Sequence, residues 1–135
     1  MNEKNKPVFS VVTSLYNSSS YIEEFYLRIQ KAIESITTQY EIIFVNDGSP
    51  DDSLKKAIRI QQQDSRVTVI DLSRNFGQHK ASMTALRYAT GSYVFLIEAD
   101  LEESPEWIID FYEKLTKEEG VDVVYGMQEQ RKGGV

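Results

Sequence analysis

The sequence predicts an α/β protein with one open, parallel β-sheet and helices on both faces. Two observations lead to this fold class. Short apolar runs rich in β-branched and aromatic residues recur along the chain, and each run is nearly continuous, which is typical of strands covered on both sides. Helical patterns separate these runs, so strands and helices alternate. Such alternation implies right-handed crossovers and parallel strands.

Five segments are expected to form strands. Each is short, apolar and bounded by polar residues that favour turns. The segments are 8–15, 40–45, 67–72, 93–97 and 121–125.

Four helices are expected between the strands. The first places apolar residues three and four positions apart on one stripe, with Ser20 and Glu23 as a possible capping box at its start. The stripe consists of Ile22, Phe25, Ile29, Ile33 and Ile36.

The other three helices are predicted from start signals and periodicity. The second should begin at Ser49-Pro50, with Ser as N-cap and Pro at the first helical position, and pack through Leu54, Ala57 and Ile58. The third should run over 78–89. The fourth should begin at Ser104-Pro105.

Composition limits the classes of function. The 135 residues suit one domain, expected over 1–135, and the net charge of −6 argues against nucleic acid as a partner. There are no cysteines, which excludes disulfides and thiolate chemistry. No apolar run reaches the roughly 20 residues that span a bilayer. We therefore expect a cytoplasmic protein, or one at the cytoplasmic face of a membrane through regions outside this chain.

Carboxylates after the fourth strand are the clearest candidates for chemistry. Ligands of open α/β sheets bind beyond the carboxyl ends of the strands. There Glu98 and Asp100 lie two residues apart, so an extended backbone would put both side chains on one side. Oxygen-only ligands suit Mg²⁺ or Mn²⁺. The alternative is that these acids favour the dipole at the start of the fourth helix, which fits Glu103 and Glu106 better than Glu98.

Asp47 follows the second strand and precedes a glycine. Its carboxylate could accept hydrogen bonds from a nucleotide base or a ribose hydroxyl. It could equally form an Asx-turn that caps the next helix. Spacing alone leaves both possibilities open.

Five segments follow one another along the chain in a recognisable order. They are VFSVVTSLYN (8–17), YEIIFVNDGSPDDS (40–53), SRNFGQHKA (73–81), ATGSYVFLIEADLEESPE (89–106) and VDVVYGMQEQR (121–131). In this order they resemble family 2 glycosyltransferases with the Rossmann-like GT-A fold. Within that family the chain is most similar to the polyprenyl-phosphate branch, which includes dolichol-phosphate mannose synthase and the undecaprenyl-phosphate sugar transferases.

The resemblance implies roles for individual residues. It places Tyr16 and Asn17 in the first nucleotide-binding loop, close to Ser14, which stands where many members have Pro. It implies that Asp47 binds the nucleotide base and that Asp100 binds the metal and the diphosphate. It places Arg131 near the phosphates. Glu98 replaces the first Asp of the D-x-D motif, and Glu102 stands near the metal. The implied catalytic acids are thus Glu98 and Asp100, and the implied metal ligands are Glu98, Asp100 and Glu102. Ser14 is counted with the implied nucleotide-binding residues.

The implied activity is the inverting transfer of a sugar from a nucleoside diphosphate sugar, with a UDP-sugar favoured, to a polyprenyl phosphate. The chain resembles the donor-binding part of such an enzyme, expected to stop before the acceptor region. The alternative is a module that binds nucleotide and metal without transferring sugar. A receiver-like signalling domain would need paired acids after the first strand, and this chain has Tyr16-Asn17 there.

Overall fold

The computed structural model describes residues 7–124 and has alternating strands and helices. In chain order the described elements are β1 (Phe9–Leu15), α1 (Ile22–Glu34), β2 (Tyr40–Asn46), α2 (Ser53–Gln63), β3 (Val67–Asp71), α3 (Gln78–Tyr88), β4 (Tyr93–Leu96) and α4 (Trp107–Lys117). The expected α/β alternation is confirmed.

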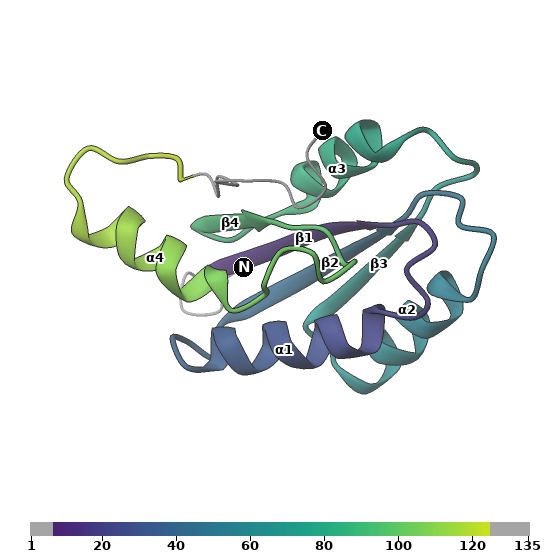
Figure 1. Cartoon of the computed structure of the whole chain (residues 1–135), viewed down its shortest axis with the longest axis horizontal. Helices are drawn as coiled ribbons and strands as arrows, with labels where there is room; N and C mark the ends of the chain where they lie inside the picture. The colour runs from purple at the N-terminus through teal and green to yellow at the C-terminus, as the bar shows by residue number, and fades with distance from the viewer. Residues whose placement is uncertain (1–6, 125–135) are drawn as a thin grey trace, which may run out of the picture.

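The strands form one parallel sheet in the order β3-β2-β1-β4 (Figure 1). Strand β1 pairs with β2 along its whole length, from Phe9 opposite Tyr40 to Leu15 opposite Asn46. On its other side, β1 pairs with β4 from Phe9 opposite Tyr93 to Val12 opposite Leu96. The central position of β1 explains its near-complete burial.

Helices cover both faces of the sheet, as predicted. Figure 1 shows α3 on one side and α1 with α2 on the other. Neighbouring strand residues point to opposite faces, so Val11 and Ile42 belong to a large core with residues of α1, α2 and α4, whereas Val12 and Ile43 belong to a smaller core with α3. Small side chains on α3, Ala81 and Ala85, let that helix lie close to the strands.

The apolar stripe of α1 packs as its periodicity predicts. Ile22, Phe25, Ile29 and Ile33 are all fully buried, and Ile36 is partly buried against the same core. The prediction for α2 was less accurate. Ala57 is buried, but Ile60 is the other main contact, and Ile58 is 39% exposed.

The predicted helix starts are wrong in three places. Helix α1 begins after Tyr21 without a side-chain cap, so Ser20 and Glu23 form no capping box. Helix α2 begins at Ser53 rather than at Ser49-Pro50. The hydroxyl of Ser49 donates to Asp51, which shapes a loop in place of a first helical turn. Helix α4 begins at Trp107, after a turn at Ser104-Pro105.

The predicted fifth strand is also not observed. Residues 121–124 have no regular secondary structure, and Tyr125 lies outside the described residues. An apolar run alone does not make a strand, since a strand also needs a partner for its hydrogen bonds. Among the described residues, no helix is both long enough and apolar enough to span a bilayer.

Candidate functional site

A cavity of about 220 Å³ lies at the carboxyl-terminal edge of the sheet. The loops after β1, β2, β3 and β4 all contribute to its wall. The lining residues are Ser14, Tyr16, Ser18, Asp47, Asn75, Gly77, Gln78, Glu98, Ala99 and Asp100.

The strand order explains why the cavity is there. From β1 the chain proceeds through β2 to β3 on one side, and it then returns to place β4 on the other side. The loops that follow β1 and β4 therefore diverge at a switch point, which is where open α/β sheets bind ligands. Five residues that the sequence singled out meet here: Ser14, Tyr16, Asp47, Glu98 and Asp100.

Asp47 does not cap helix α2, so the capping alternative is wrong. The residue is 2% exposed, and its Oδ1 accepts a hydrogen bond of 2.8 Å from the backbone N–H of Phe76. This bond ties the end of β2 to the loop between β3 and α3. Asp47 also lines the cavity, so the same carboxylate is placed to meet a ligand.

Gly48 allows the two loops to approach this closely. Its φ of +64° lies in the left-handed region, and a Cβ there would sit 2.4 Å from the backbone nitrogen of Asn75. Asn75 in turn lines the cavity. A glycine at position 48 is thus required both by the close backbone contact and by its positive φ.

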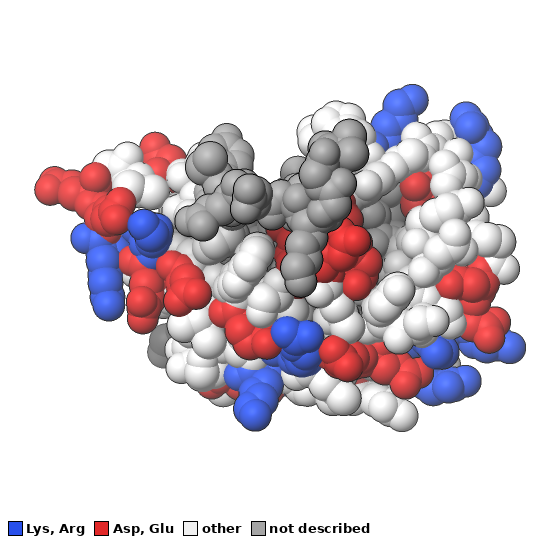
Figure 2. Space-filling view, in the orientation of Figure 1, with Lys and Arg blue, Asp and Glu red and all other residues white. Residues whose placement is uncertain are grey.

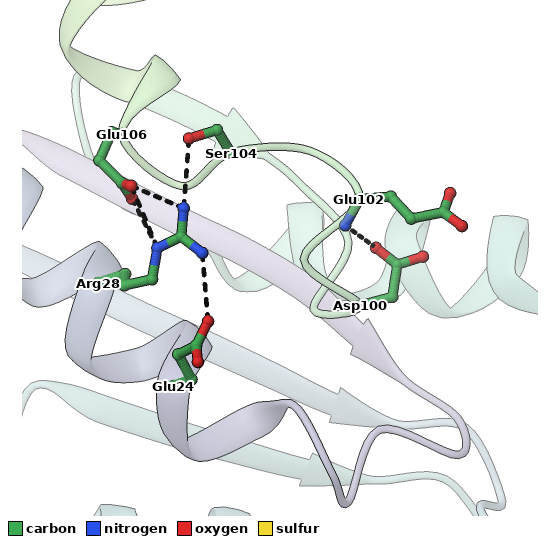
Figure 3. A network of polar contacts seen from close by, with 6 residues as sticks. All are labelled: Glu24, Arg28, Asp100, Glu102, Ser104 and Glu106. Atoms are coloured by element: carbon green, nitrogen blue, oxygen red, sulfur yellow. Dashed lines mark hydrogen bonds and ion pairs between the residues drawn. The ribbon is translucent and has the colours of Figure 1, made fainter. Parts of the chain in front are cut away.

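Acidic residues form the opposite wall. Glu98 follows β4, and its carboxylate accepts a hydrogen bond from the side-chain amide of Gln78. Asp100 Oδ1 accepts from the backbone N–H of Glu102 at 3.0 Å, which closes a turn around Leu101 (Figure 3). Leu101 has a φ of +64°, an uncommon conformation for a side chain of its size.

Mutual repulsion acts within this acidic loop. Burial raises the pKa of the Glu103 carboxyl above its ordinary value, and the negative charges of Glu98, Asp100 and Glu102 raise it further. Figure 2 shows acidic side chains in the middle of the face, with many Lys and Arg side chains toward its margins. A cation bound near this loop would relieve the repulsion.

Arg28 holds the far end of the acidic loop against α1. Its guanidinium donates to both carboxylate oxygens of Glu106, with a shortest distance of 2.6 Å, and also to Glu24 and Ser104 (Figure 3). Hydrogen bonding to Glu106 is the main cause that raises the pKa of Arg28. The two-pronged contact fixes the start of α4 relative to α1.

The carboxylate oxygens in the cavity are the type of ligand that a hard divalent cation prefers. Glu98 and Asp100 bring carboxylate oxygens to one wall of the cavity, and its described lining contains no Lys or Arg. Within residues 7–124, however, no three acidic or histidine side chains converge closely enough to form a ready metal cluster. The metal-binding role of Glu98, Asp100 and Glu102 stays a prediction.

One predicted nucleotide contact is not among the lining residues, and another cannot be compared with the structure. Asn17 is next to the cavity but does not line it, and its backbone N–H donates to Ser49 Oγ at 2.9 Å. Arg131 lies outside the described residues. Sequence reasoning gave no role to Asn75 and Gln78, although both lie within the quoted segment 73–81.

Comparison with known proteins identifies the family of the chain. The model of the family described as "Glycosyl transferase family 2" matches residues 10–134. The chain belongs to glycosyl transferase family 2. This confirms the resemblance inferred from the five sequence segments.

Over the aligned residues, the relatives described below are about a third to a half identical to the chain. A Mycobacterium tuberculosis protein described as a glycosyltransferase is 53% identical over 125 residues, which are 93% of this chain and 36% of that protein. The undecaprenyl-phosphate 4-deoxy-4-formamido-L-arabinose transferase of Klebsiella pneumoniae is 35% identical over 127 residues, or 93% of this chain and 38% of that enzyme. The chain therefore spans little more than a third of these relatives.

Solved structures confirm the GT-A fold for this family 2 chain. The mannosyltransferase PcManGT of Pyrobaculum calidifontis, in complex with GDP-Man and Mn²⁺, superposes with a TM-score of 0.70 at 24% identity, over 82% of this chain and 33% of that one. S. aureus TarS 1–349 in complex with UDP gives a TM-score of 0.62 at 22% identity, over 90% of this chain and 39% of that one.

Proposed function

We propose that the chain is the donor-binding domain of an inverting glycosyltransferase that uses a nucleoside diphosphate sugar, with UDP as the favoured nucleotide. The observation that carries this proposal is the cavity at the switch point of the sheet. One wall offers a buried carboxylate, Asp47, and the opposite wall offers Glu98 and Asp100.

The two walls suit different parts of one ligand. Asp47 is positioned to accept hydrogen bonds from N–H or O–H groups, which a nucleoside supplies through its base and ribose. A diphosphate would approach Glu98 and Asp100, and two groups of like charge repel unless a cation lies between them. Mg²⁺ or Mn²⁺ would supply that charge, with Asp100 as its main carboxylate ligand and Glu98 and Glu102 as further candidates.

The cation would also serve the reaction, because it stabilises the charge that develops on the leaving diphosphate. The domain's own residues would hold the donor in place. The complex of PcManGT with GDP-Man and Mn²⁺, which shares this fold, supports a donor of this kind. The UDP complex of TarS supports it too.

The proposed acceptor is a polyprenyl phosphate. This rests on the K. pneumoniae relative, whose name specifies undecaprenyl phosphate. Such an acceptor is already an anion, so it needs little assistance from a general base, and catalysis would come mainly from positioning. We expect the complete protein to act at the cytoplasmic face of a membrane.

One specific observation favours the alternative of a module that binds without transfer. Glu98, in the place of the first acid of the metal motif, is already hydrogen-bonded to Gln78. If that bond persists when donor binds, the domain could hold nucleotide while Glu98 takes no part in ligating the metal.

Calorimetry distinguishes these possibilities. UDP, GDP, CDP and dTDP would be titrated into the chain with and without Mn²⁺. We expect one nucleotide, UDP first, to bind in the micromolar to millimolar range only with the metal. A transfer assay with the matching sugar donor and polyprenyl phosphate then separates enzyme from binding module. Failure of all four nucleotides to bind would refute the proposed function.

A further inference from the structure

Asp51 lies in the loop between β2 and α2, outside the lining of the cavity. Its carboxylate accepts hydrogen bonds from four donors. Its Oδ1 accepts from the Ser49 hydroxyl, from the Ser53 hydroxyl at 2.6 Å and from the Ser53 backbone N–H at 3.0 Å. Its Oδ2 accepts from the backbone N–H of Ser19 at 3.0 Å. Ser19 belongs to the loop after β1, so this carboxylate bridges two loops.

The two serines extend that bridge. Each hydroxyl donates its proton to Asp51 and accepts a backbone N–H from the loop after β1. Ser49 Oγ accepts from Asn17 at 2.9 Å, and Ser53 Oγ accepts from Ser18 at 2.9 Å. Because Asp51 takes both hydroxyl protons, the oxygen lone pairs are left facing those two N–H groups.

The bonded loop forms part of the cavity wall. Tyr16 and Ser18 line the cavity, and the Tyr16 backbone N–H donates to Ser18 Oγ at 3.2 Å. Asn17, between them, has a φ of +54°, a conformation that needs support from its surroundings. Three consecutive N–H groups, those of Asn17, Ser18 and Ser19, depend directly or through a serine on one carboxylate.

We propose that Asp51 is a positioning residue for the nucleotide, which holds the loop of residues 16–19 in its ligand-ready conformation before any ligand arrives. The proposal rests on the proposed function, because it assigns Tyr16 and Ser18 to a nucleotide-binding wall. A loop that is already ordered loses less conformational freedom on binding, so the affinity for the ligand is higher.

The chemistry of the carboxylate agrees with this role. Partial burial of the Asp51 carboxyl acts to raise its pKa, but the hydrogen bonds from Ser49, Ser53 and Ser19 outweigh this and lower the pKa to about 2. Asp51 is therefore ionised at neutral pH and acts purely as an acceptor. An Asn cannot replace it, since its NH₂ group would face at least one N–H or O–H donor in either orientation.

The chain offers matched variants for a test. Asp51→Asn disrupts the whole bridge, whereas Asp52→Asn makes the same charge change one residue away, where the side chain makes no capping hydrogen bond. Ser49→Ala removes the Ser49 hydroxyl, and with it the bond to Asp51 and the link to Asn17, but leaves the contact of Asp51 with the Ser53 N–H. Ser49→Thr keeps a hydroxyl at this position and should therefore retain the link to Asn17.

Two measurements distinguish a role of Asp51 in positioning the loop for a ligand from a role in folding alone. Amide hydrogen exchange reports the loop without any ligand, and calorimetry with UDP and Mn²⁺ reports binding. We expect Asp51→Asn to accelerate exchange at Asn17, Ser18 and Ser19 at least tenfold and to weaken UDP binding three- to tenfold. Ser49→Ala should accelerate exchange mainly at Asn17, and Asp52→Asn should change neither quantity. If Asp51→Asn does not fold, Ser49→Ala and its Thr rescue carry the test.

Several outcomes would overturn the proposal. Unchanged exchange in Asp51→Asn, or in Ser49→Ala where it carries the test, would show that the bridge does not hold the loop. Faster exchange with unchanged UDP affinity would show that the bridge has no role in binding. Equal effects of Asp52→Asn would assign the result to net charge. If the unmodified chain binds no nucleotide, the proposed function itself fails and the role of Asp51 in binding with it, while its effect on exchange still identifies a structural brace.

Discussion

Negative charge is stabilised by hydrogen bonds on one side of the cavity and is disfavoured on the other. On the side of β1 and β2, Asp47 accepts a hydrogen bond from the Phe76 N–H, and the nearby Asp51 accepts hydrogen bonds from Ser19, Ser49 and Ser53. On the side of β4, burial disfavours the charged form of Glu103, and the negative charges of Glu98, Asp100 and Glu102 disfavour it further. The consequence appears in the pKa values, since that of Asp51 is lowered to about 2 and that of Glu103 is raised.

This difference indicates which part of the site is complete in the protein alone. The β1–β2 wall satisfies its carboxylates with its own hydrogen bonds, so it is preorganised. The β4 wall keeps an unbalanced charge that a cation would neutralise. The four predictions that follow test this contrast, beginning with the largest expected effect.

Gly48→Ala should disrupt the preorganised wall most strongly. The new Cβ would overlap the backbone near Asn75, and a non-glycine residue at this φ is strained. Together these effects should reduce the free energy of unfolding by about 3–4 kcal/mol, measured by urea denaturation.

Gly120→Ala is the matched control for that variant. Gly120 also has a positive φ, of +80°, but nothing lies within 4 Å of its would-be Cβ. Gly120→Ala should reduce the free energy of unfolding by about 1–2 kcal/mol, from backbone strain alone. Equal losses for the two variants would show that the contact between the loops of Gly48 and Asn75 contributes nothing.

Asp100→Asn should remove most of the metal-dependent binding on the other wall. It takes away a charged oxygen ligand and leaves the turn acceptor for Glu102 available. Affinity for UDP at saturating Mn²⁺ should fall by about 2–3 kcal/mol, or roughly 30- to 150-fold, by calorimetry. Asp110→Asn, on α4, should have no effect. Unchanged affinity in Asp100→Asn would remove the residue from the metal site.

Asp47→Asn should weaken the nucleoside contact without affecting the metal. The amide oxygen can still accept from Phe76 N–H, so the loop contact is kept while the charge is lost. We expect UDP binding to weaken by about 2 kcal/mol, in the range for hydrogen bonds to charged groups. Inorganic pyrophosphate with Mn²⁺ serves as the comparison ligand. Equal losses for both ligands would mean that Asp47 acts through the fold.

Glu103→Gln should show the smallest effect, a gain in stability. A carboxyl whose folded pKa is raised above 4.5 destabilises the fold as pH rises through that value, because the charged form is disfavoured there. Relief of the repulsion should increase the free energy of unfolding at pH 7 by about 0.5 kcal/mol without metal. At a pH well below 4.5 the gain should vanish.

The exposed Glu119→Gln provides the control for that variant. It removes the same single negative charge as Glu103→Gln, but outside the acidic loop. If both variants are stabilised to the same extent, the gain comes from total charge, and the β4 wall is under no special repulsion.

The sequence predicts elements better than it predicts contacts. The stripe on α1 and the apolar strands are visible because a periodic pattern lies within one segment. The bond from Phe76 to Asp47 joins residues 29 positions apart, and that from Arg28 to Glu106 joins residues 78 apart, so no local spacing reveals them. The helix start predicted at Ser49-Pro50 was wrong partly for the same reason, because the Ser49 hydroxyl accepts a hydrogen bond from Asn17, 32 positions away.

The place of β1 between β2 and β4 also has a consequence for the order of assembly during folding. Pairing of β1 with β2 closes a loop that contains only α1, whereas pairing of β1 with β4 must wait for everything from α1 to α3. Closing the longer loop carries the larger entropic penalty, so we expect β4 to dock late. Substitutions in β4 should then accelerate unfolding and leave the folding rate nearly unchanged. The wall that carries the acids would be the last part of the domain to form and the first to open.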